Sequence, residues 1–228
     1  MHFLITSAIM SKHGAFSVEE RFNQTIDTID SIKKYAPGSS ISLIESSVVP
    51  LNVEKYQSHL NLLVDEYIDF TRDETVISIT KQWSNQHIVK NVTESYVLSQ
   101  VLNNFKTEHN RIFKISGRYV LTDQFKLIEQ DVLDPVVVFR DKWPNNWPEG
   151  MCDIPFQYPI TGLSFSSKLI EFMQDVYTKS YFEILKHVNK QQYCDLEHAL
   201  YKFIPEEKIK LIKVTTVRGL RATDGQKN

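Results

Sequence analysis

The sequence predicts an α/β protein built as a single domain. Residues 2–9 form a short, nearly continuous apolar run, which is typical of a strand buried on both faces of a sheet. A helical pattern begins at Ser17, and a second short apolar run occupies residues 41–44. This order of strand, helix and strand predicts a parallel βαβ unit with a right-handed crossover. The 228 residues suffice for a substantial core, and no linker, repeat or low-complexity segment divides them.

The first helix carries local signals for its start and its end. Ser17 and Glu20 have the spacing of a capping box, and Pro37-Gly38 ends the helical pattern. Between these signals apolar residues recur at helical intervals and form one stripe, namely Val18, Phe22, Ile26, Ile29 and Ile32. The stripe predicts that one face of this helix packs on the sheet.

The remaining elements follow from periodicity and breakers. We expect helices at residues 53–64, 87–105, 167–186 and 195–203, and strands at 67–70, 111–115, 136–139, 161–165 and 209–214. Residues 71–85 are interpreted as a loop or a broken helix, and residues 218–228 as a mobile basic tail. The first half therefore alternates strand and helix while the second half is mixed, which predicts a mostly parallel central sheet flanked by helices.

Composition excludes several classes of protein. A net charge of −2 provides no general attraction to nucleic acid or to anionic membranes, so any anion site must be local. Cys152 and Cys194 make neither a disulfide framework nor a zinc site, which favours a reducing compartment and a cytoplasmic protein. The apolar stretch at residues 3–10 is too short to span a membrane and lacks the basic region of a signal peptide.

The stretch from Arg111 to Tyr119 is the strongest candidate for chemistry. Strong β-formers run to Ile115, the strand breaks at Ser116-Gly117, and aliphatic residues then resume it. A glycine at a strand end often marks a bulge or a close approach of the backbone. Lys114, Gly117, Arg118 and the Tyr119 hydroxyl surround this turn, and cations at a strand end suit a phosphate or diphosphate. Alternatively, the segment is a solvated strand end with ordinary surface charges.

The first strand ends in Thr6, Ser7 and Ala8, which are candidates for the same cleft. In open α/β sheets, ligands bind beyond the carboxyl ends of the strands, where the strand order reverses. Arg21, one turn into the first helix, is a further candidate, or else a surface arginine in an ordinary helix pair. Neither G-x-G-x-x-G nor G-x-x-x-x-G-K-[ST] occurs, which argues against a dinucleotide-binding dehydrogenase and a P-loop enzyme.

Lys90 and Asn91 lie in the first turns of the helix that precedes the central strand. One interpretation places them over the cleft, facing Lys114 and Arg118. The alternative is a solvent-exposed pair between Lys90 and Glu94, which have the i,i+4 spacing.

Two more segments carry candidate residues. Trp143 and Trp147 lie in a loop with polar amides, and exposed Trp faces stack well on sugar rings, although a buried loop anchor is the alternative. Asp195, Glu197 and His198 open a helix: Asp195 is a good N-cap, and each of the three is also a candidate general base toward an acceptor hydroxyl. Their spacing is not specific for a metal.

Together these motifs resemble a family of glycosyltransferase-like proteins with a GT-A (nucleotide-diphospho-sugar transferase) fold, found in bacteria, phages and large viruses. The matching segments are Arg21–Thr25, Thr28–Ile32, Ile44–Ser46, Lys90 with Glu94–Tyr96, Phe113–Tyr119, Leu196–Leu200 and Gly219–Gly225. The resemblance implies a single Rossmann-type GT-A-like domain, with a nucleotide-binding half at 1–110 and an acceptor or catalytic half at 111–217. It implies a nucleotide-sugar donor, a glycan or lipid-linked acceptor and a role in polysaccharide biosynthesis.

The resemblance also implies site roles and shows one departure. Thr6, Ser7, Ala8, Lys90 and Asn91 would contact the donor. Such enzymes usually carry Asp-x-Asp after the central strand, holding Mg²⁺ or Mn²⁺ on the diphosphate, whereas this sequence reads Ser116-Gly117-Arg118. Asp123 and Asp131 are isolated carboxylates.

Fixed Arg and Lys side chains can stabilise a leaving diphosphate without a metal. We therefore expect metal-independent donor binding by Lys114 and Arg118, helped by Lys90, although Mg²⁺ or Mn²⁺ stays an option.

Two other functions fit the sequence less well. A binding module on the same fold would hold nucleotide or glycan without transfer, and the missing Asp-x-Asp supports it. A different α/β enzyme acting on phosphorylated metabolites, such as a nucleotidyltransferase, would normally need a Gly-rich phosphate loop and acidic metal ligands. Nucleic-acid binding is not expected because charge is balanced and no basic stripe occurs.

Overall fold

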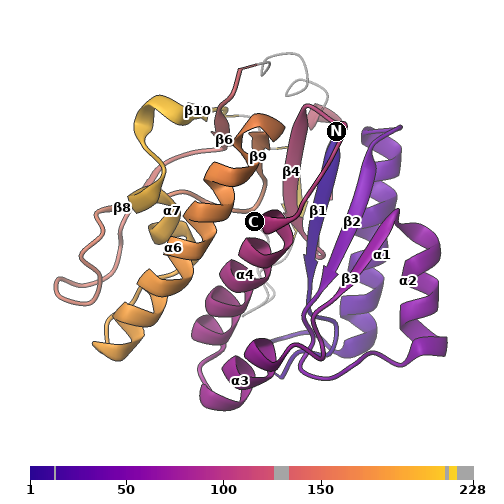
Figure 1. Ribbon diagram of the computed structural model, residues 1–228, viewed down its shortest axis with the longest axis horizontal. Coiled ribbons are helices and arrows are strands. Elements are labelled where there is room, and N and C mark those ends of the chain that lie inside the picture. The colour runs from indigo at the N-terminus through magenta and orange to yellow at the C-terminus, as the bar shows by residue number, and fades with distance from the viewer. Residues whose placement is uncertain (13, 126–133, 214–215, 220–228) are drawn as a thin grey trace.

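The computed structural model describes residues 1–12, 14–125, 134–213 and 216–219. Its centre is a seven-stranded sheet with the strand order β10-β6-β9-β4-β1-β2-β3 (Figure 1). Strand β9 runs antiparallel to its neighbours β4 and β6, whereas the other pairs are parallel. The strands are β1 (His2–Ser7), β2 (Ser40–Glu45), β3 (Glu66–Asp69), β4 (Arg111–Ser116), β6 (Val137–Phe139), β9 (Leu163–Ser166) and β10 (Ile209–Leu211). The expected mixed, mostly parallel sheet is confirmed.

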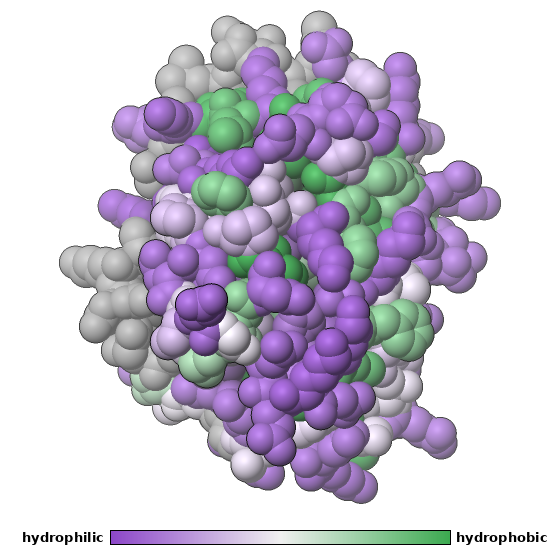
Figure 2. All heavy atoms as spheres, turned by 90° about the vertical axis from the view of Figure 1, so that its left-hand side faces the viewer, coloured by the Kyte–Doolittle hydropathy of each residue, from purple (hydrophilic) through white to green (hydrophobic). Residues whose placement is uncertain are grey.

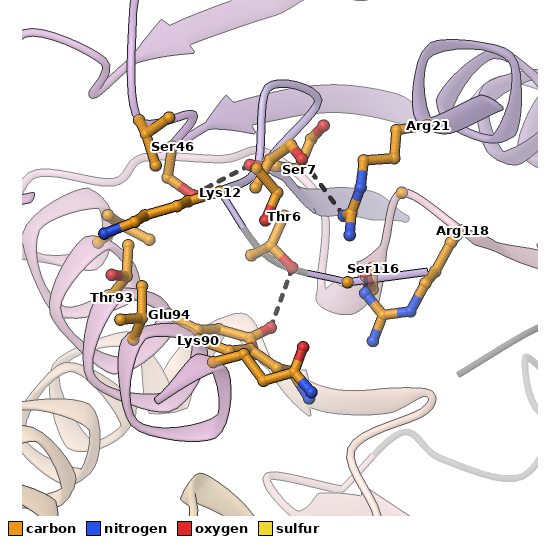
Figure 3. A pocket seen from close by; sticks show the side chains of 18 of the residues that line it. Thr6, Ser7, Lys12, Arg21, Ser46, Lys90, Thr93, Glu94, Ser116 and Arg118 are labelled. Carbon is orange, nitrogen blue, oxygen red and sulfur yellow. Dashed lines mark hydrogen bonds between the residues drawn. The ribbon is translucent and has the colours of Figure 1, made fainter. Parts of the chain in front are cut away.

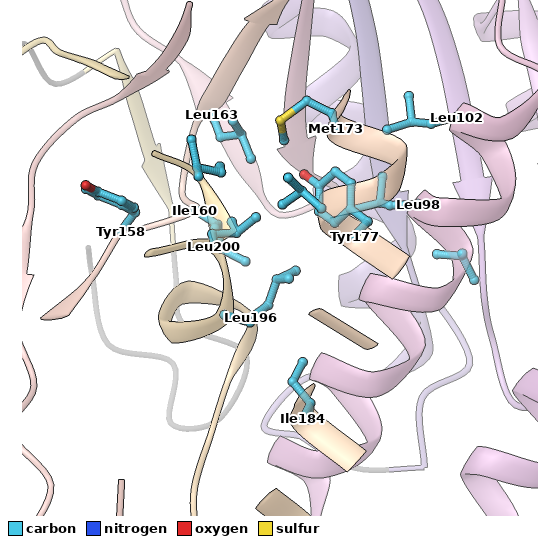
Figure 4. Close-up of a cluster of buried hydrophobic side chains, with 14 of the residues drawn as sticks. Leu98, Leu102, Tyr158, Ile160, Leu163, Met173, Tyr177, Ile184, Leu196 and Leu200 are labelled. Atoms are coloured by element: carbon cyan, nitrogen blue, oxygen red, sulfur yellow. The ribbon is translucent and has the colours of Figure 1, made fainter. Parts of the chain in front are cut away.

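Helices cover both faces of this sheet (Figure 1). Helices α1 (Val18–Tyr35) and α2 (Ser58–Leu63) pack on one face, where they share a hydrophobic cluster with the strands. On the other face a second cluster joins the strands to α3 (Glu74–Gln82), α4 (Gln86–Asn103), α6 (Ile170–Asn189) and α7 (Leu196–Phe203) (Figure 4). Single 3₁₀ turns lie at Asp123–Phe125, Ser167–Leu169 and Glu206–Lys208. None of the helices in these described ranges is long and apolar enough to cross a membrane.

Alternation along the strands decides which face each side chain meets. In β1, Phe3 and Ile5 belong to the cluster under α1, while Leu4 belongs to the cluster under α4. In β4, Ile112 faces α4, and Phe113 faces α1. By the same alternation, Thr6 in β1 and Lys114 in β4 also face α4.

The βαβ unit predicted at the start of the chain is present. Strands β1 and β2 pair in parallel from His2 opposite Ser40 to Ser7 opposite Glu45. The capping box forms as expected: the Ser17 hydroxyl accepts from the Glu20 N–H at 3.3 Å, and Glu20 Oε2 accepts from the Ser17 N–H at 2.7 Å. Local signals therefore define this unit well.

Several boundaries differ from expectation. Residues 71–85 hold the regular helix α3, whose N-cap Asp73 accepts from the Val76 N–H at 3.0 Å. The expected helix at 53–64 begins as a π-helical turn, Val53–Gln57, before α2. The loop at 141–159 contains a short hairpin of β7 (Trp143–Pro144) and β8 (Phe156–Gln157).

The chain after Arg118 does not resume β4. Strand β5 (Tyr119–Leu121) leaves the main sheet and pairs antiparallel with β11 (Val217–Gly219). Residues 218 and 219, expected in a mobile tail, are thus part of a strand, and Gly219 lies against Tyr119. A Cβ atom on Gly219 would overlap the Tyr119 ring and the Arg118 carbonyl, so the pairing requires glycine there. The remaining predictions for residues 214, 215 and 220–228, and for Asp131, lie outside the described residues.

Candidate functional site

A cavity opens where the strand order reverses. From β1 the chain moves outward through β2 and β3, and then returns to β4 on the other side of β1. The carboxyl ends of β1, β2 and β4 therefore meet at one edge, and their residues line the cavity: Thr6, Ser7, Ala8, Ser46, Ser116, Gly117 and Arg118. Its space is about 1040 Å³, with the open mouth included.

Two helices complete the wall. Helix α1 contributes Arg21, Gln24 and Thr25, and the first half of α4 contributes residues between Gln86 and Val97. Asn85 caps α4, and its side chain accepts from the N–H groups of the first turn. The positive end of the α4 dipole therefore faces the cavity and favours an anion there.

The cavity is rich in cations. Lys12, Arg21, Lys90 and Arg118 line it, and Glu94 is the only carboxylate among its described lining residues. Arg21 is held by the carbonyls of Phe16 and Ala8, each at 3.4 Å. Burial lowers the pKa of Arg21, and the nearby positive charge of Arg118 lowers it further. The two guanidinium groups lie close to each other, as Figure 3 shows. This concentration of positive charge suits a multiply charged anion.

Arg118 is the most exceptional of these cations. Its Nη1 donates to Ser116 Oγ at 2.9 Å, and its guanidinium lies 5.1 Å from the centre of the Tyr119 ring. Its Nε atom is buried yet donates to no acceptor in the described part of the chain, and no carboxylate there pairs with it. Arg118 lines the cavity without a carboxylate partner among the described residues, so its charge is available to an anion there. Tyr119 itself does not line the cavity, but its ring contacts the Arg118 guanidinium.

Gly117 permits the close approach of β4 to α1. A Cβ atom at this position would lie 2.9 Å from Thr25 Oγ1. That hydroxyl lies 3.2 Å from the Gly117 carbonyl and 2.9 Å from the Arg21 carbonyl, so it joins the two segments that carry the arginines. The glycine identified in the sequence therefore acts through packing, and it also lines the cavity.

Lys114 is not where the sequence placed it. It is 1% exposed, does not line the cavity, and forms a buried ion pair with Glu94. Alternation explains the error: Lys114 shares the face of Ile112, which α4 covers, and the break in the strand comes two residues later. The expected exposed pair between Lys90 and Glu94 is replaced by this buried pair with Lys114, and Lys90 stays exposed at the cavity wall.

Asn91 also has a different position from the expected one. It is 5% exposed, its Nδ2 donates to the His87 carbonyl at 2.9 Å, and its Oδ1 accepts from the Leu196 N–H at 3.3 Å. Asn91 thus joins α4 to the start of α7 and does not line the cavity. This contact brings the α7 candidates beside the wall of the cavity.

Asp195 and His198 are engaged with each other. Asp195 caps α7; its Oδ1 accepts from the His198 N–H at 3.0 Å and lies 2.6 Å from His198 Nδ1, and its Oδ2 accepts from the Tyr193 hydroxyl at 3.0 Å. His198 is fully buried, and its Nε2 lies 3.3 Å from Asn145 Oδ1. The His198 side chain therefore links α7 to the 141–159 loop, and Asp195 holds His198 and Tyr193 together.

Glu197 is the α7 residue best suited to exchange a proton. It is half-buried, and its Oε1 accepts only from the Ile160 N–H at 3.2 Å among the residues described. Burial and the charge of Asp195 raise the pKa of Glu197 to about 7, although the positive charge of Lys90 opposes this. A carboxyl with such a pKa is matched to general base catalysis at neutral pH. The effect of the Lys90 charge on this pKa places Glu197 near Lys90, which lines the cavity, whereas Glu197 itself does not line it.

Both tryptophans of the loop are partly exposed. Trp147 is 42% exposed and packs against the Tyr193 ring at 4.0 Å, which places it beside Asp195. Trp143 is 38% exposed and donates from its Nε1 to Asp141 Oδ2 at 3.3 Å. The face that carries this loop and α7 shows scattered apolar residues among hydrophilic ones (Figure 2). Neither residue lines the cavity, so together they mark a second region next to α7.

Several lining residues were missed from the sequence, among them Lys12, Ser46 and Glu94. Lys12 lies in the polar loop after β1, Ser46 follows β2, and Glu94 lies on α4. Lys12 and Ser46 could have been found from the sequence, because both come at or after the end of a strand. Glu94 was recognised only as a partner for Lys90, because its true partner comes from another element.

Comparisons with solved structures identify this architecture. No protein-family model and no curated protein sequence matches the chain. The galactosyltransferase LgtC, solved in complex with donor and acceptor sugar analogues, shares 9% identity and a TM-score of 0.57 over 92% of this chain and 73% of its own. The bifunctional glycosyltransferase WbbM in its apo form shares 10% identity and a TM-score of 0.54 over 93% of this chain and 38% of its own.

The glycosyltransferase GlyE of Streptococcus pneumoniae shares 9% identity and a TM-score of 0.51, over 93% of this chain and 45% of its own. The chain has a GT-A-like fold. At these identities the likeness concerns the fold, and the chemistry has to be argued from the site itself.

In this GT-A-like fold, the end of β4 does not offer ligands for a divalent cation. Mg²⁺ and Mn²⁺ prefer carboxylate oxygens, whereas Ser116 and Arg118 provide a hydroxyl and a guanidinium. The described residues contain no group of three or more His, Cys, Asp or Glu side chains placed to hold a metal ion. Glu94, the lining carboxylate, is already paired with Lys114. The described residues of the cavity wall therefore fit a bound anion and do not fit an acidic metal site.

Proposed function

We propose that this protein is a glycosyltransferase that moves a sugar from a nucleoside diphosphate donor to a hydroxyl acceptor. The observation that carries the proposal is the cationic cavity at the reversal point of a GT-A-like sheet, with Arg21 and Arg118 close together in its wall. Lys12, Arg21, Lys90 and Arg118 would neutralise a diphosphate there. The polar ends of β1 and β2 would hold the nucleoside, as ligands are held at reversal points.

Transfer on this site requires no group beyond the chain's own residues. The bond between the sugar C1 and the diphosphate oxygen breaks, and its electron pair stays on the leaving diphosphate. The acceptor oxygen bonds to C1, and its proton passes to a base. Arg118 and Lys90 would stabilise the charge on the leaving diphosphate, where fixed cations act most strongly. Metal-independent donor binding follows as part of the proposal.

Glu197 would be the base for the acceptor. Its pKa of about 7, raised by burial and by Asp195, leaves it ionised in weakly alkaline solution and able to take a proton. The 141–159 loop, with Trp147 on Tyr193, would bind the glycan or lipid-linked acceptor beside it. Asp195 and His198 would hold this region together and not exchange protons themselves.

A module that binds nucleotide or glycan without transfer is the second candidate. The engagement of both Asp195 oxygens and both His198 nitrogens supports it, since only Glu197 is left to act as a base in α7. Such a module would bind nucleotides yet neither transfer nor hydrolyse the donor.

Titration calorimetry and thermal shift with nucleotides test the proposal. UDP, GDP, CDP, dTDP and CMP, with their sugar conjugates, would each be added in EDTA, in Mg²⁺ and in Mn²⁺. At a hundredfold excess over Kd, a ligand of the folded state adds about 2.7 kcal/mol to the free energy of unfolding. We expect one nucleoside diphosphate to bind in EDTA, and Arg118→Ala to weaken it at least about 30-fold, as loss of a charge-assisted pair implies.

Arg72→Ala is the matched control, because Arg72 is exposed and does not line the cavity. Equal weakening by both variants, or binding that appears only with Mn²⁺, would refute the proposed donor site. Binding without transfer or donor hydrolysis over a panel of glycan acceptors would favour the binding module. Failure of every nucleotide to bind would refute the transferase and the nucleotide-binding module, and only a module that binds glycan would be left.

A further inference from the structure

Glu94 is a carboxylate in the wall of a cavity whose other charged groups are cations. Its Oε1 accepts from Thr6 Oγ1 at 3.0 Å and from Lys114 Nζ (Figure 3 shows the first of these bonds). Its Oε2 has no hydrogen-bond partner among the described residues and is not a fully buried atom. Since Glu94 lines the cavity, this oxygen is open to a ligand.

The buried ion pair lets a carboxylate exist beside an anion site. Burial alone would raise the pKa of Glu94, but the ammonium of Lys114, followed by Lys90, outweighs it and lowers the pKa to about 2. Glu94 is therefore ionised at neutral pH. Lys114 cancels its charge at contact distance, so the pair does not repel a diphosphate bound by Arg118 and Lys90.

The open oxygen selects for a hydroxyl group. An ionised carboxylate only accepts hydrogen bonds, and an ionised phosphate oxygen also only accepts, so phosphate is not the partner. A hydroxyl group donates, and its bond to a carboxylate is charge-assisted. Within the proposed donor, hydroxyl groups occur on the ribose and on the transferred sugar.

The position of Glu94 favours the transferred sugar. Ser46, Val48 and Thr80 line the cavity on the side of β2 and α3. Glu94 lies on the opposite side, bonded to Lys114 of β4 and within electrostatic reach of Tyr177 on α6. Lys90 lies near both Glu94 and Glu197, because its charge affects the pKa of both. A donor whose diphosphate contacts Lys90 and whose sugar faces the acceptor base would therefore bring its sugar to Glu94.

Resting on the proposed transferase function, we propose that Glu94 Oε2 accepts a hydrogen bond from a hydroxyl group of the transferred sugar. Glu94 is then a specificity-determining residue for the donor sugar. Lys114 is a positioning residue, which holds the carboxylate ionised and directed into the cavity.

The test measures sugar recognition separately from nucleotide recognition. Glu94→Leu with Lys114→Met removes both charges together, which keeps the buried pair neutral and avoids an isolated buried charge. Glu94→Gln with Lys114→Met keeps a polar group and guards against misfolding of the first variant. Calorimetry would compare wild type and both variants for UDP, GDP, CDP and dTDP and for their hexose conjugates, with folding checked by thermal unfolding.

We expect both variants to bind the nucleoside diphosphate within about threefold of wild type. The Leu variant should lose about 10- to 100-fold in affinity for the hexose conjugate, as expected for one hydrogen bond to a charged group. The Gln variant should lose less. Monodeoxy-hexose conjugates would identify the hydroxyl: removing it should weaken wild type by a similar factor and leave the Leu variant unchanged.

Three outcomes would overturn the inference. Equal affinity of wild type and Leu variant for the conjugate would show that Glu94 does not contact the sugar. Loss of affinity for the diphosphate itself in the Leu variant would assign Glu94 to the nucleotide. If wild type binds no nucleotide at all, the proposed function fails and the inference fails with it, whereas the first two outcomes leave the proposed function standing.

Discussion

Replacing Gly117 by alanine probes the contact that holds the two arginine-bearing segments together. The new methyl group would lie 2.9 Å from Thr25 Oγ1, closer than a carbon normally approaches an oxygen, at a residue that is 1% exposed. Gly117 does not have a positive φ, so the clash is the main penalty. Overpacking of a buried site costs about 1–3 kcal/mol, and we expect Gly117→Ala to lower the free energy of unfolding by that amount.

A double-mutant cycle tests the assigned cause. Thr25→Ala alone should cost about 1 kcal/mol, because it removes a hydroxyl that lies 2.9 Å from one carbonyl and 3.2 Å from another. It also removes the atom with which the Gly117→Ala methyl group clashes. Urea unfolding of the double variant should therefore show a loss smaller than the sum of the two single losses by at least about 1 kcal/mol.

Gly38→Ala serves as the control for this cycle. Gly38 has a φ of +80°, and no atom lies within 4 Å of the point that a methyl group would occupy, so its penalty comes from the backbone alone. Its effect should add to that of Thr25→Ala within about 0.5 kcal/mol. If the stability losses of Gly117→Ala and Thr25→Ala add as closely as those of the control pair, the contact with Thr25 is not the reason for glycine at position 117.

Two further changes have defined effects on stability. Lys114→Met alone should lower the free energy of unfolding by about 3–5 kcal/mol, because it leaves Glu94 buried and unpaired. Adding Glu94→Gln should restore much of this loss. Urea unfolding measures both variants, and equal stability of the two would contradict the buried pair. The pKa of Glu197 is raised to about 7 in the folded protein, so its contribution to stability is present below its ordinary pKa of 4.5 and is lost as pH rises to about 7. As pH rises from 4.5 to 7, Glu197→Gln should therefore become more stable relative to wild type, by about 3 kcal/mol at most. Thermal unfolding of both proteins across that range measures this. A stability difference that does not change with pH would contradict the raised pKa of Glu197.

The sequence was informative wherever its signals were local. The capping box of Ser17 and Glu20 and the apolar runs around it defined the first βαβ unit, because neighbouring residues decide capping and periodicity. The strand ends at Thr6 and Ser116 then located the cavity, since parallel strands bring their carboxyl ends to one edge. Helix α3 was missed although Asp73, Val76 and Ile79 have the spacing of a capped helix, so that signal was present and was overlooked.

Long-range partners could not be obtained in this way. The charge of Lys114 suggested a phosphate ligand, but strand alternation and Glu94 on a different element turn it into a buried counter-ion. Asn91 likewise meets the backbone of Leu196, more than a hundred residues later in the chain. The departure of β5 from the sheet depends on β11, whose pairing no local pattern records. Tertiary contacts, and not propensity, settle each of these.

The pairing of β5 with β11 has a consequence for how the protein is made. The two strands lie about 100 residues apart in sequence, and they join a segment next to Arg118 to one near the end of the described chain. Pairings of such separation form late, because the intervening chain must first be ordered. During synthesis, β1, β2 and β4 can emerge and pair well before Val217–Gly219 leaves the ribosome. The turn that carries Arg118 therefore gains its partner strand only after the chain has been made as far as Gly219.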